Sequence, residues 1–203
     1  MSSLEDRKKS KAGVPFYSQH RECFGEELVG NIACAPTCFK MCLEFFRIFP
    51  KMSVLEMYKY GLLMKGKTGA GFKHDFIVEE FKRAGLIVDR FDKYGEYKRE
   101  ESEINKIKIE LEFIDAIKKC LDNKGVIMNS EYMPRKSENK DEETRGSHFC
   151  VITNYSIDEN GDLDGFYLND PNFKFENEGK NRWYSLNDFL LNSRKLAIII
   201  NNY

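Results

Sequence analysis

The stretch CAPTCFKMCLEFF, residues 34–46, decides how the chain folds. Its apolar residues recur with the period of an α-helix, so we expect a helix over residues 34–46. A proline is tolerated in the first turn of a helix, where its missing N–H costs nothing, and this fits Pro36. Cys34 is therefore expected at the N-terminus of the helix. Cys38 and Cys42 lie deeper on it and are expected to pack as small apolar groups.

The position of Cys34 has a chemical consequence. Unpaired backbone N–H groups and the helix dipole favour negative charge at a helix N-terminus, which lowers the pKa of a thiol there. Of the six cysteines, only Cys34 has this placement, because Cys120 and Cys150 lie in apolar patterns and Cys23 lies in a loop without a clear pattern. Cys34 is the candidate nucleophile.

The composition of the chain excludes several classes of protein. With 203 residues, 41% hydrophobic and 13% aromatic, the chain can bury one sizeable core and is not a disordered protein. Its 32 Lys and Arg residues against 33 Asp and Glu give a net charge of −1, so no overall field attracts nucleic acid or an anionic membrane. No apolar run approaches the roughly 18–20 residues of a membrane helix.

The charged N-terminus lacks the apolar segment of a secretory signal. We therefore expect a disordered lead-in over residues 1–13, a single domain over residues 14–203 and a cytoplasmic location, with secretion by a non-standard route left open. The oligomeric state stays undetermined.

Disulfides and metal ions are not expected. Cysteines spaced along one helix seldom reach disulfide geometry, so reduced thiols are the better interpretation. His20 and Cys23 lie upstream of the helix cysteines, but no C-x-x-C pair occurs and the spacing fits no common zinc site. A structural zinc protein built from these residues is kept as an alternative, and no cofactor is expected.

Helices come first along the chain. A second helix is expected over residues 53–64, because Ser53 and Glu56 form the pattern of a capping box. A flexible loop is expected over residues 65–71, a helix over 75–84 closed by Gly85, and a strand over 86–91. Residues 93–112 are charge-dense and are expected to form a linker or a solvated helix face, before an amphipathic helix over 113–121.

Strands dominate the second half. They are expected over residues 126–130, 148–155, 165–168 and 196–200. Turn residues at 158–162 predict that the second and third of these strands pair antiparallel, and Ser185 is expected to cap a short helix. Residues 134–146 are expected to form a mobile loop. Helices followed by strands favour an α+β fold.

A nucleophilic thiol needs an imidazole that takes its proton and later protonates the leaving amine. The candidates are His20, His74 and His148. His148 opens an apolar strand that would hold its ring rigidly, His74 begins a helix and is explained as a surface or capping residue, and His20 remains a competitor.

The imidazole needs an acceptor, and the tetrahedral intermediate needs hydrogen-bond donors. Asp170 follows the strand expected to pair with the His148 strand, although Asn-Asp-Pro is equally ordinary turn chemistry. The backbone N–H of Cys34 is one donor for the oxyanion, and the side-chain amide of Gln19 is a candidate for the second.

Four segments carry a family resemblance: VPFYSQ (14–19), ACAPTCFKM (33–41), SHFCVITNY (147–155) and YLNDP (167–171). Together, and in this order, they resemble the papain-like peptidases that remove double-glycine leaders from bacteriocins, and the stand-alone relatives of those peptidases. The resemblance extends over residues 14–200. It includes the segment around residues 69–72 and a closing strand, helix and strand over residues 183–200.

The resemblance implies a papain-like fold, in which an N-terminal helical half carries the nucleophile at a helix N-terminus and packs on a C-terminal antiparallel sheet. It also implies that Cys34 attacks a carbonyl, that His148 is the general base and acid, that Asp170 orients His148, and that Gln19 helps to form the oxyanion hole.

The main hypothesis is a cysteine peptidase that cleaves a peptide or isopeptide amide bond through a thioester. The partner would be a peptide or protein substrate, without nucleic acid or a membrane span. The same residues suit an amidase, deamidase or acyltransferase, because these enzymes share the thioester. The alternative from another class is a peptide-binding module that kept the fold without catalysis.

Overall fold

The structure is a computed structural model that describes residues 13–68, 71–134 and 145–202. The expected lead-in over residues 1–13, apart from Gly13, lies outside the described residues, as does most of the expected loop over 134–146. The helices are α1 (Gln19–Glu22), α2 (Glu27–Gly30), α3 (Cys34–Phe45), α4 (Val54–Leu63), α5 (His74–Arg83), α6 (Tyr94–Arg99), α7 (Glu103–Asp122), α8 (Glu176–Gly179) and α9 (Leu186–Asn192). The strands are β1 (Lys67–Thr68), β2 (Gly71–Phe72), β3 (Ile87–Asp92), β4 (Val126–Pro134), β5 (Arg145–Ile157), β6 (Leu163–Asn169), β7 (Arg182–Ser185) and β8 (Ser193–Asn201).

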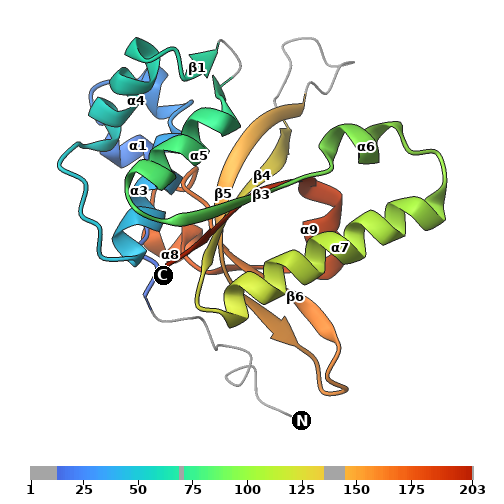
Figure 1. Ribbon diagram of the computed structural model, residues 1–203. Coiled ribbons are helices and arrows are strands. Elements are labelled where there is room, and N and C mark those ends of the chain that lie inside the picture. The colour runs from blue at the N-terminus through green and yellow to red at the C-terminus, as the bar shows by residue number, and fades with distance from the viewer. Residues whose placement is uncertain (1–12, 69–70, 135–144, 203) are drawn as a thin grey trace.

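Six of these strands form one twisted sheet in the order β3-β8-β4-β5-β6-β7, and every neighbouring pair is antiparallel (Figure 1). The expected β5–β6 hairpin is confirmed, with Tyr155 opposite Phe166. Its turn is held by Asp158, whose carboxylate accepts hydrogen bonds from the backbone N–H groups of Asn160 and Asp162, each at 2.9 Å.

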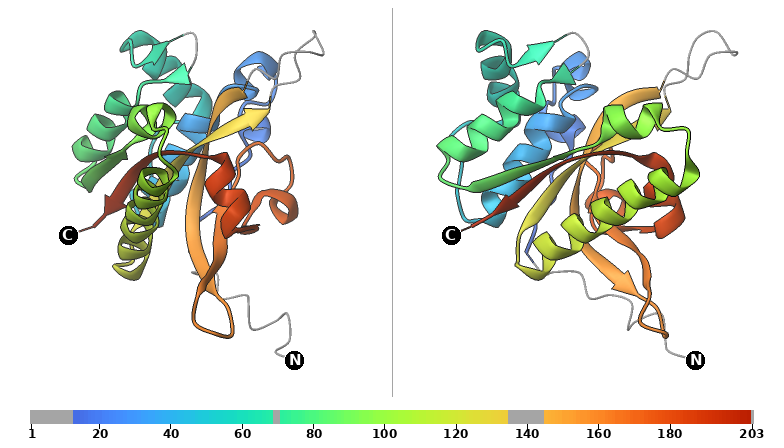
Figure 2. Two further views of the ribbon diagram at one scale, coloured as in Figure 1. Left: turned by 90° about the vertical axis from the view of Figure 1, so that its right-hand side faces the viewer. Right: turned by 45° about the vertical axis from the view of Figure 1, so that its right-hand side comes forward.

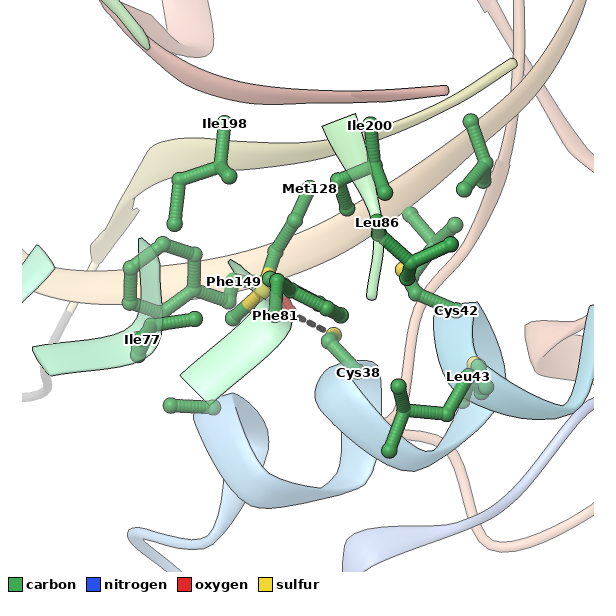
Figure 3. Packing of buried hydrophobic residues seen from close by; sticks show 14 of the residues in the cluster. Cys38, Cys42, Leu43, Ile77, Phe81, Leu86, Met128, Phe149, Ile198 and Ile200 are labelled. Carbon is green, nitrogen blue, oxygen red and sulfur yellow. Dashed lines mark hydrogen bonds between the residues drawn. The ribbon is translucent and has the colours of Figure 1, made fainter. Parts of the chain in front are cut away.

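Helices cover both faces of the sheet (Figure 2). On one face α3 and α5 pack against β4, β5 and β8. Figure 3 shows this core, where Cys38 of α3 and Phe81 of α5 lie against Met128 and Phe149 of the sheet. On the other face α7 and α9 place Phe113 and Phe189 against the sheet, with the two rings stacked 6.0 Å apart.

The helix α3 begins at Cys34, as the sequence predicts, and Pro36 lies in its first turn. The capping box of α4 is also confirmed. The Ser53 hydroxyl accepts from the backbone N–H of Glu56 at 3.2 Å, and the Glu56 carboxylate accepts from the backbone N–H of Ser53 at 2.8 Å. The expected α+β arrangement, with a helical N-terminal half packed on an antiparallel sheet, is therefore confirmed.

One expectation about a connecting segment was wrong, and for another segment the structure decides between the two expected alternatives. The segment expected as a loop over residues 65–71 contributes to the β1–β2 hairpin, although residues 69–70 lie outside the described residues. The charge-dense segment is not a linker but a helical one, formed by α6 and the first half of α7. Ser102 caps α7, and buried Ile109 extends the apolar face of Phe113 and Ile117 toward the N-terminus. The alternative interpretation, a solvated helix face, is the one that holds.

The turn that follows β6 forms hydrogen bonds with the N-terminal segment on one side and with Gly179 on the other. The side chain of Asn169 donates to the carbonyl oxygen of Pro15 at 3.1 Å, and the backbone N–H of Gln19 donates to the carbonyl oxygen of Pro171 at 2.9 Å. On the other side of the turn, the backbone N–H of Asp170 donates to the carbonyl oxygen of Gly179 at 2.8 Å. Asp170 and Gln19 are thereby positioned by one set of backbone contacts.

Gly179 is required for this close packing. A Cβ atom at Gly179 would lie 2.5 Å from the ring of Phe16 and 2.7 Å from the backbone oxygen of Asp170. Because one of these contacts is with the backbone, we expect Gly179→Ala to lower the free energy of unfolding by about 1–3 kcal/mol, measured by urea denaturation. Gly95→Ala in α6 is the control, since its Cβ would meet only the end of the Arg99 side chain at 3.8 Å. Equal unfolding free energies for Gly179→Ala and the parent chain would contradict this role.

Candidate active site

Cys34 is the first residue of α3 and is half-buried. Its thiol forms a hydrogen bond with the ring of His148, and the backbone N–H groups of Ala35 and Phe149 donate to its sulfur. Donors from the helix start and from β5 thus converge on one sulfur atom. Such surroundings stabilise a thiolate.

His148 lies on β5 and is 4% exposed. Its Nε2 atom lies 2.8 Å from Oδ1 of Asp170, the residue that directly follows β6. The ring also forms a hydrogen bond with the Cys34 side chain. Because Nε2 is occupied by Asp170, the contact with Cys34 uses the other ring nitrogen, Nδ1. The three side chains form one hydrogen-bonded chain from thiol to carboxylate.

The pKa values of Cys34, His148 and Asp170 are shifted so that a negative thiolate and a positive imidazolium are favoured. Burial alone would raise the pKa of Cys34, but the hydrogen bond and the positive charge of His148 outweigh burial and lower it. Burial alone would lower the pKa of His148, but the contacts with Asp170 and Cys34 raise it. The pKa of Asp170 is lowered despite burial, through the hydrogen bond to His148 and the backbone N–H of Asn172. The opposite shifts of Cys34 and His148 favour a thiolate–imidazolium pair.

Gln19 is 2% exposed and begins α1, which packs against α3. Its side-chain Nε2 donates to Oδ1 of Asn172 at 3.4 Å. Its Oε1 atom is buried without a hydrogen-bond partner among the described residues. The carboxamide is therefore held at one end, close to the turn that contains Asp170.

The other two histidines are not part of the hydrogen-bonded chain Cys34–His148–Asp170. The His20 ring lies 3.1 Å from the backbone oxygen of Asn172 and 3.2 Å from its Oδ1. His74 packs its ring against Phe149 with centroids 4.8 Å apart, and burial lowers the pKa of His74 to about 4. Neither ring is brought to Cys34 by a described contact, whereas His148 is.

All six cysteines are free thiols. Burial raises the pKa of the thiols at four positions, Cys23, Cys38, Cys42 and Cys150. Cys38 donates to the backbone oxygen of Phe149 at 3.2 Å, so its sulfur is used in packing α3 against β5 (Figure 3). In contrast to these four, Cys34 has a lowered pKa.

Two polar residues near the chain of hydrogen bonds were not expected from the sequence. Asn172 contacts Gln19, His20 and Asp170, and its position directly after Pro171 is a signal that could have found it. Glu131 is 7% exposed and lies directly opposite His148 in the β4–β5 register. It lies directly after the strand expected over residues 126–130, and the sequence gives no sign of its burial, because that depends on pairing with β5.

An apolar pocket lies beside the start of α3. It is bounded by α3, α4, β2 and α5, and the first residues after Cys34 form part of its wall. Its lining residues are Ala35, Pro36, Phe39, Met52, Met57, Tyr60, Phe72, Phe76, Ile77 and Glu80. The pocket therefore begins at the residue that directly follows Cys34.

Within the described residues, no helix is long and apolar enough to cross a membrane. His20 and Cys23 do not belong to any group of three or more possible metal ligands there, whereas His148, Cys150 and Asp170 form such a group.

Comparison with known proteins gives the following relations. No curated protein matches the chain at a significant level. Among solved structures, the peptidase domain of Streptococcus ComA, a bifunctional ABC transporter of a quorum-sensing pathway, is 12% identical and has a TM-score of 0.48. That alignment covers 85% of this chain and 93% of the ComA domain. A double glycine motif protease from an AMS/PCAT transporter, solved with its leader peptide, is 13% identical with a TM-score of 0.46, and the alignment covers 84% of each chain.

The family comparison covers most of the sequence. The expected fold class, a papain-like arrangement with the candidate nucleophile at the start of a helix packed on an antiparallel sheet, is confirmed. The family model that matches is described as the Peptidase_C39 like family, and it spans residues 11–195. The chain therefore belongs to the Peptidase_C39 like family.

Proposed function

We propose that this protein is a cysteine peptidase that hydrolyses an amide bond of a peptide or protein through a thioester. The observation that carries the proposal is the hydrogen-bonded chain Cys34–His148–Asp170, in which the pKa of the thiol is lowered and that of the imidazole is raised. A structural cysteine has no need of this arrangement. Membership of the Peptidase_C39 like family supports the same reaction class.

In the first half of the reaction, the Cys34 thiolate attacks the carbonyl carbon of the scissile amide. The carbonyl π electrons move to oxygen, which becomes an oxyanion. As this intermediate collapses, the C–N bond breaks, the leaving nitrogen takes the proton from Nδ1 of His148, and a thioester to Cys34 remains.

In the second half, neutral His148 removes a proton from water, and the hydroxide formed attacks the thioester carbon. Collapse of the second oxyanion expels the Cys34 thiolate and releases the carboxylic acid. Asp170 holds the ring orientation and stabilises the imidazolium in both halves, without taking the proton itself.

The oxyanion requires donors at the start of α3. The backbone N–H of Cys34 is one, and Gln19 is the proposed second. The Gln19 amide is buried and has one side-chain hydrogen bond, to Asn172 at 3.4 Å. Its position in α1, tied to the turn after Asp170, supports this role.

Two other functions use the same site. An amidase, deamidase or acyltransferase would form the same thioester and differ only in the leaving group or the second acceptor. A peptide-binding module would not need a stabilised thiolate, so the opposite pKa shifts of Cys34 and His148 favour an enzyme.

The apolar pocket beside α3 is the proposed binding site for an apolar side chain of the substrate. Its wall begins at Ala35, directly after the nucleophile, and its lining is almost entirely aliphatic and aromatic. Burial of an apolar side chain there would contribute about 1.5–3 kcal/mol to binding.

The thiolate can be tested without a substrate. With a limiting amount of iodoacetamide near neutral pH, we expect Cys34 to be alkylated first among the six thiols, as mapped by mass spectrometry. Its alkylation rate should rise with pH through a pKa below that of an ordinary thiol. In His148→Ala the burial remains but the charge and hydrogen bond are lost, so the pKa should rise and the rate at pH 7 should fall about tenfold or more. An unchanged alkylation rate of Cys34 in His148→Ala would contradict the proposed thiolate–imidazolium pair.

The reaction can be tested with a peptide library. We expect Cys34→Ala to abolish cleavage of every peptide that the parent protein cleaves, while peptide binding and the free energy of unfolding change little. Cys42→Ala is the control, since this buried thiol lies on the same helix without a contact to His148 or Asp170 among those described. Full cleavage by Cys34→Ala would exclude the proposed nucleophile, and peptide binding without cleavage by the parent protein would favour the binding module.

The pocket can be tested at its rim. Met52 is 40% exposed and lines the pocket, so Met52→Glu would place a charge where an apolar side chain binds. We expect KM to rise about tenfold with a small change in kcat, because the lost contact is uniform binding. Leu63→Glu is the matched control, at a residue of α4 that is 79% exposed and does not line the pocket. Equal KM values for the two variants would place the substrate side chain elsewhere.

A further inference from the structure

Behind the catalytic thiol, the described residues include a compact group of possible metal ligands. Nε2 or Nδ1 of His148, Sγ of Cys150 and a carboxylate oxygen of Asp170 all lie within 4.8 Å of one another, and all three residues are buried. His148 and Cys150 are two residues apart on β5, so they share a face of the strand. Asp170 follows β6, the neighbouring strand. His148 and Cys150 are thus fixed by the sheet, and Asp170 by the turn that directly follows β6.

Glu131 lies beside this group of three and contacts it through Cys150, so it is the candidate for a fourth ligand. It lies on β4 directly opposite His148 and is 7% exposed. Its Oε2 accepts a hydrogen bond from Sγ of Cys150 at 3.5 Å. Residues paired directly across antiparallel strands place their side chains on the same face, so Glu131, His148 and Cys150 face the same side of the sheet.

The ligand set of one nitrogen, one sulfur and two carboxylates suits zinc. Zinc takes Cys, His and Asp or Glu ligands in tetrahedral geometry, with bonds of about 2.0–2.3 Å and therefore ligand atoms about 3.5 Å apart. The separations within His148, Cys150 and Asp170, up to 4.8 Å, need side-chain adjustments on the order of 1 Å. The 3.5 Å between Glu131 Oε2 and Cys150 Sγ already matches a tetrahedral site.

Further hydrogen bonds already orient the two carboxylates. Nδ2 of Asn129 donates to Oε1 of Glu131 at 3.1 Å, which leaves Oε2 for the position of Cys150. The backbone N–H of Asn172 donates to Oδ1 of Asp170 at 2.9 Å. Such partners are typical of the residues that surround a metal site.

Packing alone does not explain Glu131 and Cys150. Cys150 belongs to the apolar core between the sheet and helices α7 and α9, where an alanine or valine would fill the space without a polar atom. Burying a carboxyl group in such a place costs free energy unless polar partners compensate for the lost water. The chain nevertheless keeps both polar groups next to His148 and Asp170.

We propose that Glu131, His148, Cys150 and Asp170 form a zinc site whose occupation inhibits the enzyme. Zinc would replace the thiol proton of Cys150 and the proton shared by His148 and Asp170, and both would leave to solvent. The metal would then hold the ring and the carboxylate that orients it, so His148 no longer transfers protons. The inhibition rests on the proposed function, whereas the binding of zinc does not.

The experiment measures metal binding in Cys34→Ala, which lacks the nucleophile. Co²⁺ serves as the probe, because a Co²⁺–thiolate bond gives a charge-transfer band in the near ultraviolet. We expect one equivalent of Co²⁺ to produce this band and Zn²⁺ to displace it. The band should persist in Cys34→Ala/Cys42→Ser and vanish in Cys34→Ala/Cys150→Ser. Zn²⁺ should also raise the thermal unfolding midpoint of Cys34→Ala but not of Cys34→Ala/Cys150→Ser.

A further variant covers the case in which the Cys150 variant does not fold. Glu131→Gln in the Cys34→Ala background removes one ligand and is expected to weaken Zn²⁺ binding by tenfold or more. Three results would each overturn the proposed site. The thiolate band could be absent in Cys34→Ala, it could survive without Cys150, or the Zn²⁺ affinity could be unchanged in Glu131→Gln. In the enzyme with Cys34, Zn²⁺ should abolish peptide cleavage and a chelator should restore it. Metal binding without any cleavage activity would contradict the proposed function and leave the site standing.

Discussion

The 2.8 Å contact between Nε2 of His148 and Oδ1 of Asp170 is the interaction on which the proposed chemistry of this protein depends. It fixes which ring nitrogen faces Cys34, and it compensates an imidazolium that burial would otherwise disfavour. The contact itself depends on the antiparallel pairing of β5 with β6, which brings His148 on β5 close to the turn after β6 that contains Asp170. The packing of α3 against β5 then places Cys34 beside His148 and completes the chain of hydrogen bonds.

The buried thiols of this protein have pKa values shifted in opposite directions, although burial itself raises each of them. Burial raises the pKa at Cys42 and Cys150, and the carboxylates of Asp170 and Glu131 raise that of Cys150 further. At Cys34 burial acts in the same direction, yet His148 and two backbone N–H groups outweigh it. The proposed selectivity for one thiol among six is thus a matter of what each sulfur contacts, and the degree of burial alone does not separate them.

Local signals in the sequence predicted the elements that carry the candidate site. The proline in the first turn set the start of α3, the Ser53–Glu56 pair set the start of α4, and apolar periodicity located β5 and β6. The β1–β2 hairpin was not predicted, because such short strands form only against a partner and carry little pattern of their own. The strand β7 was expected only from the family resemblance, as the first part of the closing strand, helix and strand. The burial of Glu131 depends on its pairing with β5, which no local rule contains.

The contact between Gln19 and Asn172 joins residues 153 positions apart in the sequence. Contacts of this kind close long loops, so they form late and make folding slow relative to that of proteins with local contacts. During synthesis, Cys34 leaves the ribosome long before β5 and the turn after β6 exist. Its thiol is then an ordinary one, without an imidazolium beside it. The chain order therefore delays the appearance of a reactive thiolate until the fold that contains it is complete.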